Sequence, residues 1–173
     1  MRFSQLDRII ALEVGKSISA VKCLSLSEEY LQDHFPRFPV MPGVLMLESL
    51  FQASMWLVRS THEFKYSSVV LRESKSLKFQ GFVQPGDSLE VTAEIKSTSE
   101  SLTSLKVRGT VNGNPATSGR IVVDTFNLAD RENVDPAIDK YMNHQFRKTF
   151  RQLCNQLDQN DLADLPKQPL VND

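Results

Sequence analysis

Two titratable side chains and a glycine lie close together in the segment DHFPRFPVMPGVLMLESLFQ, which runs from Asp33 to Gln52. Histidine titrates near physiological pH, so His34 is a candidate base. Glu48 lies in an apolar run, where an unpaired carboxylate would be costly. Glu48 therefore keeps its proton, has a partner, or lies on a helix that is not buried. A base and a proton-holding acid are the groups that general acid–base catalysis requires.

The local sequence predicts how these groups are positioned. Pro36, Pro39 and Pro42 force an extended, stiff loop, because each fixes its own φ and disfavours helix in the residue before it. From Gly43 to about Ser60 the pattern is helical and apolar nearly all round, which is typical of a helix inside a protein. Gly43 would open this helix, where an unpaired N–H and the helix dipole favour negative charge.

Strand patterns lie on both sides of this helix. Before it, residues 7–14 and 18–26 predict a hairpin around Gly15 and Lys16, followed by a short helical turn. After it come four alternating segments: SSVVLRESKSLKF, SLEVTAEIKS, SLTSLKVRGTV and ATSGRIVVDTF. Asn112-Gly113 is a strong hairpin signal. The sequence therefore predicts an α+β fold in which a curved antiparallel sheet is wrapped around one central helix.

The composition changes after Phe126. Apolar residues then recur at three- and four-residue steps, which predicts an additional amphipathic C-terminal helix; they are Ile138, Tyr141, Met142, Phe146, Phe150, Leu153 and Leu157. We expect this stripe to pack against the domain or a subunit neighbour, and Cys154 to be a packing residue. The predicted organisation is a domain over residues 1–127, a helical extension over 128–160 and a disordered tail over 161–173.

Bulk properties exclude several classes of protein. The chain has 173 residues and a formal net charge of -1, so no basic field points to nucleic acid as a partner. No apolar run approaches the roughly 18 to 20 residues of a membrane span, and the N-terminus lacks the apolar stretch of a signal peptide. Cys23 and Cys154 are far apart and form no metal-type spacing. We therefore expect reduced thiols and a cytoplasmic location.

The segment HFPRFPVMPGVLMLESLFQ resembles the signature of the (3R)-hydroxyacyl-acyl carrier protein dehydratases, the FabZ/FabA family, which usually reads close to HFPGxPxMPGVLxxEAxxQ. The flanking VGKSISAVKCLSLSEEYLQDHFP and the later FVQPGDSLEVTAEI are similar to that family in the same order. The resemblance covers roughly residues 6 to 125. It implies the hotdog fold and a homodimer, or a trimer of dimers, with composite active sites that draw residues from both protomers.

The resemblance also implies roles for individual residues. His34 would be the base, Glu48 of the opposite protomer the acid, and the Gly43 N–H would polarise the thioester carbonyl. Gln52 would form hydrogen bonds within the site. The acyl tunnel would be lined by Phe35, Val44, Leu45, Phe79 and Val83. The substrate would be carried on the phosphopantetheine of acyl carrier protein, with no other cofactor and no metal.

Several residues depart from the family pattern. Arg37 replaces the usual glycine of HFPGxP, and it would bind a phosphopantetheine phosphate or an acidic carrier, or narrow the tunnel mouth. The segment RESKSLKFQGF is less basic than the corresponding segment of the family. In the family that segment helps to dock the carrier protein. These departures leave open a non-catalytic hotdog binding module or an acyl thioesterase. His34 would then be an ordinary loop histidine, and Glu48 would reach solvent or pair with a cation at a subunit interface.

Overall fold

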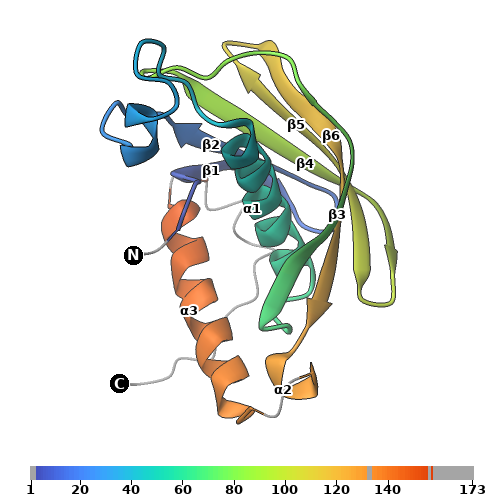
Figure 1. Ribbon diagram of the computed structural model, residues 1–173. Coiled ribbons are helices and arrows are strands. Elements are labelled where there is room, and N and C mark those ends of the chain that lie inside the picture. Colours follow the sequence, from blue (N-terminus) through green and yellow to red (C-terminus); the bar gives the residue numbers. More distant parts are fainter. Residues whose placement is uncertain (1–2, 132–133, 156, 158–173) are drawn as a thin grey trace.

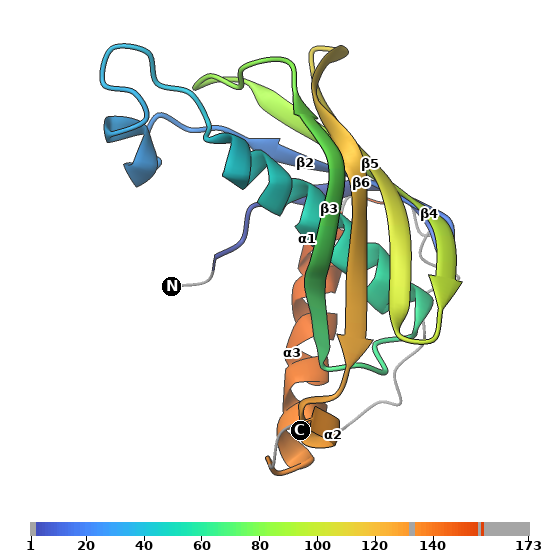
Figure 2. The same ribbon diagram turned by 45° about the vertical axis from the view of Figure 1, so that its right-hand side comes forward.

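A single curved sheet organises the molecule. The computed structural model describes residues 3–131, 134–155 and 157. The strands in this part of the chain pair antiparallel in the order β1-β2-β4-β5-β6-β3. Their bounds are β1 Arg8–Glu13, β2 Ser17–Cys23, β3 Ser68–Phe79, β4 Ser88–Ser99, β5 Leu102–Val111 and β6 Asn114–Phe126. Figure 1 and Figure 2 show the sheet curving around helix α1, Gly43–Thr61, which confirms the predicted architecture.

Alternation along the strands explains why one face of the sheet packs on the helix. In β4, Leu89, Val91 and Ala93 are buried, whereas Glu90 and Glu94 between and beside them are exposed. This is the period-two pattern of a strand with one face in the core. The predicted hairpin turn also forms. Asn112 and Gly113 both have positive φ, 50° and 79°, which is the conformation that the favoured two-residue turn requires.

Helix α1 is enclosed, as its apolar sequence predicts. It contacts strands β2 to β6 on the concave face of the sheet. Its buried positions include polar residues whose hydroxyl groups donate hydrogen bonds within the helix: Ser49 to the Leu45 carbonyl and Ser54 to the Leu50 carbonyl. Each buried hydroxyl is thus satisfied without a partner outside the helix.

The helical extension predicted over 128–160 contains two helices in its described part. A short helix α2, Leu128–Arg131, is followed by α3, Ala137–Leu153, whose N-cap is Pro136. Proline lacks an N–H and clashes with the preceding turn, so it is tolerated at a helix start and not inside one. The short 3-10 helix Glu29–Gln32 precedes the proline loop. The predicted disordered tail, residues 161–173, lies outside the described residues.

The apolar stripe of α3 packs inward only in its second half. Phe150 is 2% exposed, and its ring lies 5.7 Å from that of Trp56 on α1 and 5.2 Å from that of Phe64. Ile138 and Tyr141, at the other end of the helix, are 41% and 65% exposed, so the rest of the chain covers these two members of the stripe only in part. Burial raises the pKa of the Cys154 thiol to about 12, in keeping with a packing residue.

A buried arginine on α1 contacts both α3 and the segment that follows α1. Arg59 on α1 is 3% exposed and donates hydrogen bonds to the carbonyls of Tyr66 and Ser67. Its guanidinium also lies 3.7 Å from the ring centre of Phe146 on α3. Burial lowers the pKa of Arg59 to about 10, so the side chain stays charged at neutral pH.

None of the helices in the described part of the chain combines the length and the apolar character that a bilayer span requires.

The contribution of α3 to stability is measurable with one buried and one exposed substitution. We expect Phe150→Ala to lower the free energy of unfolding by about 3 to 5 kcal/mol, because it leaves a cavity against Trp56 and Phe64. Tyr141→Ala on the exposed side of the same helix is the control and should change stability by less than about 0.5 kcal/mol. Urea denaturation of both variants gives the comparison, and equal midpoints would contradict the packing of α3 described above.

Candidate active site

The proline loop holds His34 in a defined orientation. The backbone N–H of His34 donates to the Tyr30 carbonyl at 3.0 Å, and the N–H of Val40 donates to the His34 carbonyl at 3.0 Å. The ring atom Nδ1 lies 2.9 Å from the Val40 carbonyl oxygen. A carbonyl oxygen can only accept, so Nδ1 carries the proton in the neutral ring. Nε2 then keeps a lone pair, which is the form that a general base needs.

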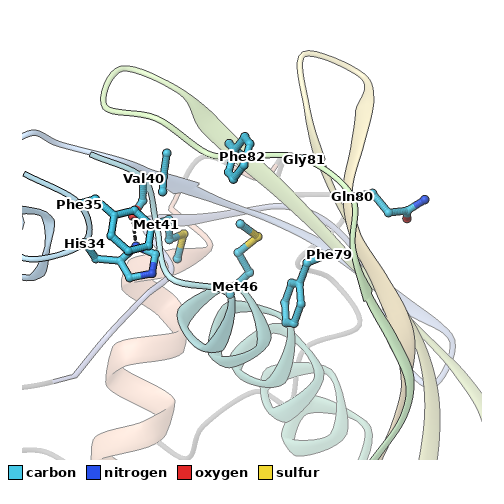
Figure 3. Close-up of a pocket in the computed structure, with 10 residues that line it drawn as sticks. His34, Phe35, Val40, Met41, Met46, Phe79, Gln80, Gly81 and Phe82 are labelled. Atoms are coloured by element: carbon cyan, nitrogen blue, oxygen red, sulfur yellow. Dashed lines mark hydrogen bonds between the residues drawn. The ribbon is translucent and has the colours of Figure 1, made fainter. Parts of the chain in front are cut away.

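His34 lines a pocket of about 330 Å³ at the N-terminal end of α1 (Figure 3). The walls come from the proline loop, from the first turn of α1, and from the end of β3 with the segment that follows it: His34, Phe35, Val40, Met41, Gly43, Met46, Phe79, Gln80, Gly81 and Phe82. Two contacts tie the loop to that segment. The Met41 N–H donates to the Val83 carbonyl at 2.9 Å, and the rings of Phe38 and Phe82 meet edge to face at 5.3 Å.

Gly43 brings a helix N-terminus to the same pocket. It is the first residue of α1, after the N-cap Pro42, and its N–H belongs to the first turn, where no intrahelical acceptor exists. A Cβ at this position would lie 3.2 Å from two ring atoms of Phe79, so only glycine leaves that ring undisturbed. The pocket therefore contains a free imidazole nitrogen and a helix terminus that favours negative charge.

Glu48 lies on a different side of α1. It is five positions after Gly43, which places it about 140° further around the helix axis. There it is half-buried in a second pocket, of about 400 Å³, between α1, the N-terminal segment and α3. The residues that line this pocket are Phe3, Ser4, Glu48, Phe51, Gln52, Met55, Trp56, Gln145, Phe146 and Thr149. Within one chain, His34 and Glu48 thus line separate pockets.

Gln52 links Glu48 to the start of the chain. Its side-chain Nε2 donates to Glu48 Oε1 at 2.8 Å and to the Phe3 carbonyl at 3.0 Å, while its Oε1 accepts from the Gln5 N–H at 2.8 Å. Gln52 is only 7% exposed, so these bonds are protected from water. The Gln52 side chain therefore orients the carboxyl group of Glu48 and also holds the N-terminal segment against α1.

The predicted site residues divide into three groups. His34, Phe35, Gly43 and Phe79 share the first pocket, and Glu48 and Gln52 share the second. The remaining four line neither pocket: Arg37 and Val44 are exposed, Leu45 is half-buried against the core, and Val83 is completely buried in the core.

Sequence reasoning missed several residues that line the first pocket: Val40, Met41, Met46, Gln80, Gly81 and Phe82. Met46 could have been found, because it is one helical turn after Gly43 and shares its side of α1. Phe82 carried no comparable signal, since its place depends on how the segment after β3 approaches the proline loop. In Figure 3 the side chain of Gln80 points away from the other labelled residues.

The described residues contain no group of three or more histidine, cysteine, aspartate or glutamate side chains that could hold a metal ion.

Comparison with known proteins relates most of the chain to one family. Residues 1–123 match the model of the FabA-like domain. A 3-hydroxyacyl-[acyl-carrier-protein] dehydratase FabZ of Ruminiclostridium cellulolyticum is 40% identical over 119 residues, which is 69% of this chain and 84% of that protein. The protein of the same name from Listeria monocytogenes is 34% identical over 128 residues, 74% of this chain and 87% of that protein.

Solved structures share the fold at lower identity. The dehydratase heterocomplex ApeI:P from Xenorhabdus doucetiae aligns with a TM-score of 0.60 at 17% identity and covers 73% of this chain and 85% of that one. A Streptococcus mutans protein bound to acetyl CoA aligns with a TM-score of 0.57 at 14% identity, over 73% of this chain and 93% of that one. At this identity the likeness concerns the fold alone.

The Gln52 contacts predict a specific loss of stability. In Gln52→Leu the buried Gln5 N–H loses its acceptor, so we expect the free energy of unfolding to fall by about 1 to 3 kcal/mol. Gln152→Leu, on the exposed face of α3, is the control and should stay within about 0.5 kcal/mol of the unmodified chain. Chemical denaturation measures both. If Gln52→Leu were as stable as its control, the contacts of Gln52 would not hold the N-terminal segment in place.

Proposed function

We infer that this chain, which belongs to the FabA-like family, is a 3-hydroxyacyl-[acyl-carrier-protein] dehydratase of fatty acid or related lipid or polyketide biosynthesis. The observation that carries the inference is the arrangement in the first pocket. There a histidine whose Nε2 keeps its lone pair shares a mostly apolar cavity with the N-terminal amide of a helix. An enolate formed from a thioester needs these two groups, a base and a donor for the developing oxyanion.

The first half of the reaction would take place in this pocket. The thioester carbonyl oxygen accepts a hydrogen bond from the Gly43 N–H, and Nε2 of His34 removes a proton from the carbon next to the carbonyl, C2. A single donor aimed at a developing oxyanion is typically worth about 3 kcal/mol of the barrier. The bond from Nδ1 to the Val40 carbonyl remains in the imidazolium form and stabilises it.

The second half requires an acid, and we assign it to Glu48 of a second protomer. The electron pair left at C2 forms the C2–C3 double bond, the C3–O bond breaks, and Glu48 gives its proton to the departing hydroxyl, so that water leaves. Transfer of a proton from His34 back to Glu48 restores both groups.

The free edge of the sheet supports a homodimer. Strand β3 pairs with β6 on one side and is last in the strand order, so its other edge has no partner within the described chain. Val70, Leu71 and Phe79 on this strand are 40%, 36% and 51% exposed. A second copy that pairs along β3 would cover these side chains and remove the open edge. A dimer or a trimer of dimers is compatible with this edge.

The acid and the base of the proposed reaction both come from the protein, so we propose no cofactor beyond the phosphopantetheine arm of the substrate. The partner would be acyl carrier protein, as the names of the relatives state for those proteins. We further propose a cytoplasmic location. Cys23 and Cys154 are both free thiols, which is the usual state in a reducing compartment.

Substitution of the two titratable residues tests the proposal. With 3-hydroxyacyl thioesters as substrates, the purified chain should form trans-2-enoyl thioesters, which are followed by their ultraviolet absorbance. We expect His34→Ala and Glu48→Gln each to lower kcat by at least about a hundredfold, because each removes one proton-transfer group. His144→Ala, at an exposed position on α3, is the control and should retain full activity.

Two results would contradict the proposal. One is dehydration that persists in both His34→Ala and Glu48→Gln. The other is release of free thiol without formation of the enoyl product, which would identify thioester hydrolysis instead.

A further inference from the structure

The pocket that contains Glu48 extends well beyond this residue along α1. Its α1 lining residues fall on successive turns of one helix face, from Glu48 through Phe51 to Met55 and Trp56. Eight residues of helix correspond to about 12 Å of length. Apart from Glu48 and Gln52, the helix offers only apolar side chains to this space. The pocket is thus an elongated apolar slot with the proposed acid in its wall.

The opposite wall belongs to α3, which follows the part of the chain that matches the FabA-like domain, residues 1–123. Gln145, Phe146 and Thr149 supply this wall. Figure 1 shows α3 on the side of α1 that faces away from the sheet. The wall is held firmly, because Phe146 packs against the Trp56 ring at 6.2 Å and the Arg59 guanidinium at 3.7 Å. A rigid wall of this kind limits what the slot can hold.

The order of atoms in the proposed substrate says which part of it reaches the slot. From the carrier onward come the sulfur, the carbonyl carbon C1, C2, C3 with its hydroxyl, and then the hydrocarbon tail. In the proposed reaction Gly43 binds the oxygen on C1, His34 acts at C2, and Glu48 of the partner acts at the oxygen on C3. The tail therefore continues past Glu48, on the side away from His34, where the apolar slot begins.

We propose that the slot between α1 and α3 of one protomer receives the acyl tail of the substrate whose thioester lies in the His34 pocket of the other. Helix α3 then sets the tail length that the enzyme accepts, through Phe146 and Thr149. This inference rests on the proposed function. A hydrocarbon tail fits the chemistry of the slot, since transfer of its methylene groups from water to apolar walls is favourable.

The test changes the volume of the slot and measures selectivity for tail length. Thr149→Trp fills the slot from the α3 side, and Gln152→Trp adds the same side chain at an exposed position of the same helix. For each variant, kcat/KM is measured with 3-hydroxybutyryl and 3-hydroxydecanoyl thioesters. We expect the ratio of kcat/KM for the decanoyl substrate to kcat/KM for the butyryl substrate to fall by at least about tenfold in Thr149→Trp. The same ratio should stay unchanged in Gln152→Trp. Phe146→Leu widens the slot and should raise this ratio above that of the unmodified chain.

The outcomes separate this inference from the proposed function. If the unmodified chain dehydrates neither substrate, the proposed function fails. If it dehydrates both and the ratio is the same in Thr149→Trp, Phe146→Leu and the control, the tail does not enter the slot, and the inference alone is overturned. Thermal midpoints identify a variant that is merely unfolded, and in that case Gln145→Met and Thr149→Met provide milder changes of the same wall.

Discussion

The enclosure of helix α1 is the constraint on which the rest of the structure depends. The concave sheet covers one side of the helix, and the aromatic residues of α3 cover part of the other. Because each residue turns the helix by about 100°, Gly43 and Glu48, five positions apart, lie about 140° apart around its axis. The N-terminal amide of Gly43 opens into the His34 pocket, while Glu48 points to the slot beneath α3. Helix α1 therefore contributes residues to two pockets that lie on different sides of its axis.

This geometry makes a second copy of the chain a requirement of the proposed chemistry. A two-fold axis repeats the same patch on both subunits, so an acid from one copy and a base from the other form two identical sites at once. Polar contacts around α1 orient the proposed acid and the proposed base within each chain. Gln52 orients the Glu48 carboxyl group, and the Val40 carbonyl fixes the tautomer of His34. Both are buried or half-buried contacts within one chain, so each half of the site is formed before the halves meet.

Local sequence patterns were sufficient for most of the fold. The helix was expected from Gly43 to about Ser60 and ends at Thr61, because its apolar character and the preceding prolines are local signals. The strands followed from alternation and from turn residues such as Asn112 and Gly113. Periodicity also located the C-terminal helix, since the predicted stripe begins at Ile138 and α3 begins at Ala137. Ile138 and Tyr141 are nevertheless exposed, although they share the period of the buried Phe150. Periodicity identifies a stripe but not how much of it meets a partner.

The candidate site was predicted less completely, for a similar reason. His34 and Gly43 line one pocket, and the neighbouring prolines and the helix start that place them are local signals. Val44 and Val83 were expected in the acyl tunnel by resemblance, yet Val44 is exposed and Val83 belongs to the core. Arg37, which departs from the family pattern, is exposed, and its predicted role stays a prediction. Pocket walls are made by segments far apart in sequence, here the proline loop and the residues after β3. Their approach is a tertiary property that no single segment encodes.

Activity in mixed dimers tests the central claim most directly. Chains with His34→Ala and chains with Glu48→Gln are unfolded together, refolded as an equimolar mixture and assayed for dehydration. If each site combines His34 of one protomer with Glu48 of the other, every mixed dimer has one intact site, and random pairing restores about a quarter of the unmodified activity. If both residues of a site come from one chain, no intact site can form in any dimer. Activity that stays at the level of the separate variants would contradict the account.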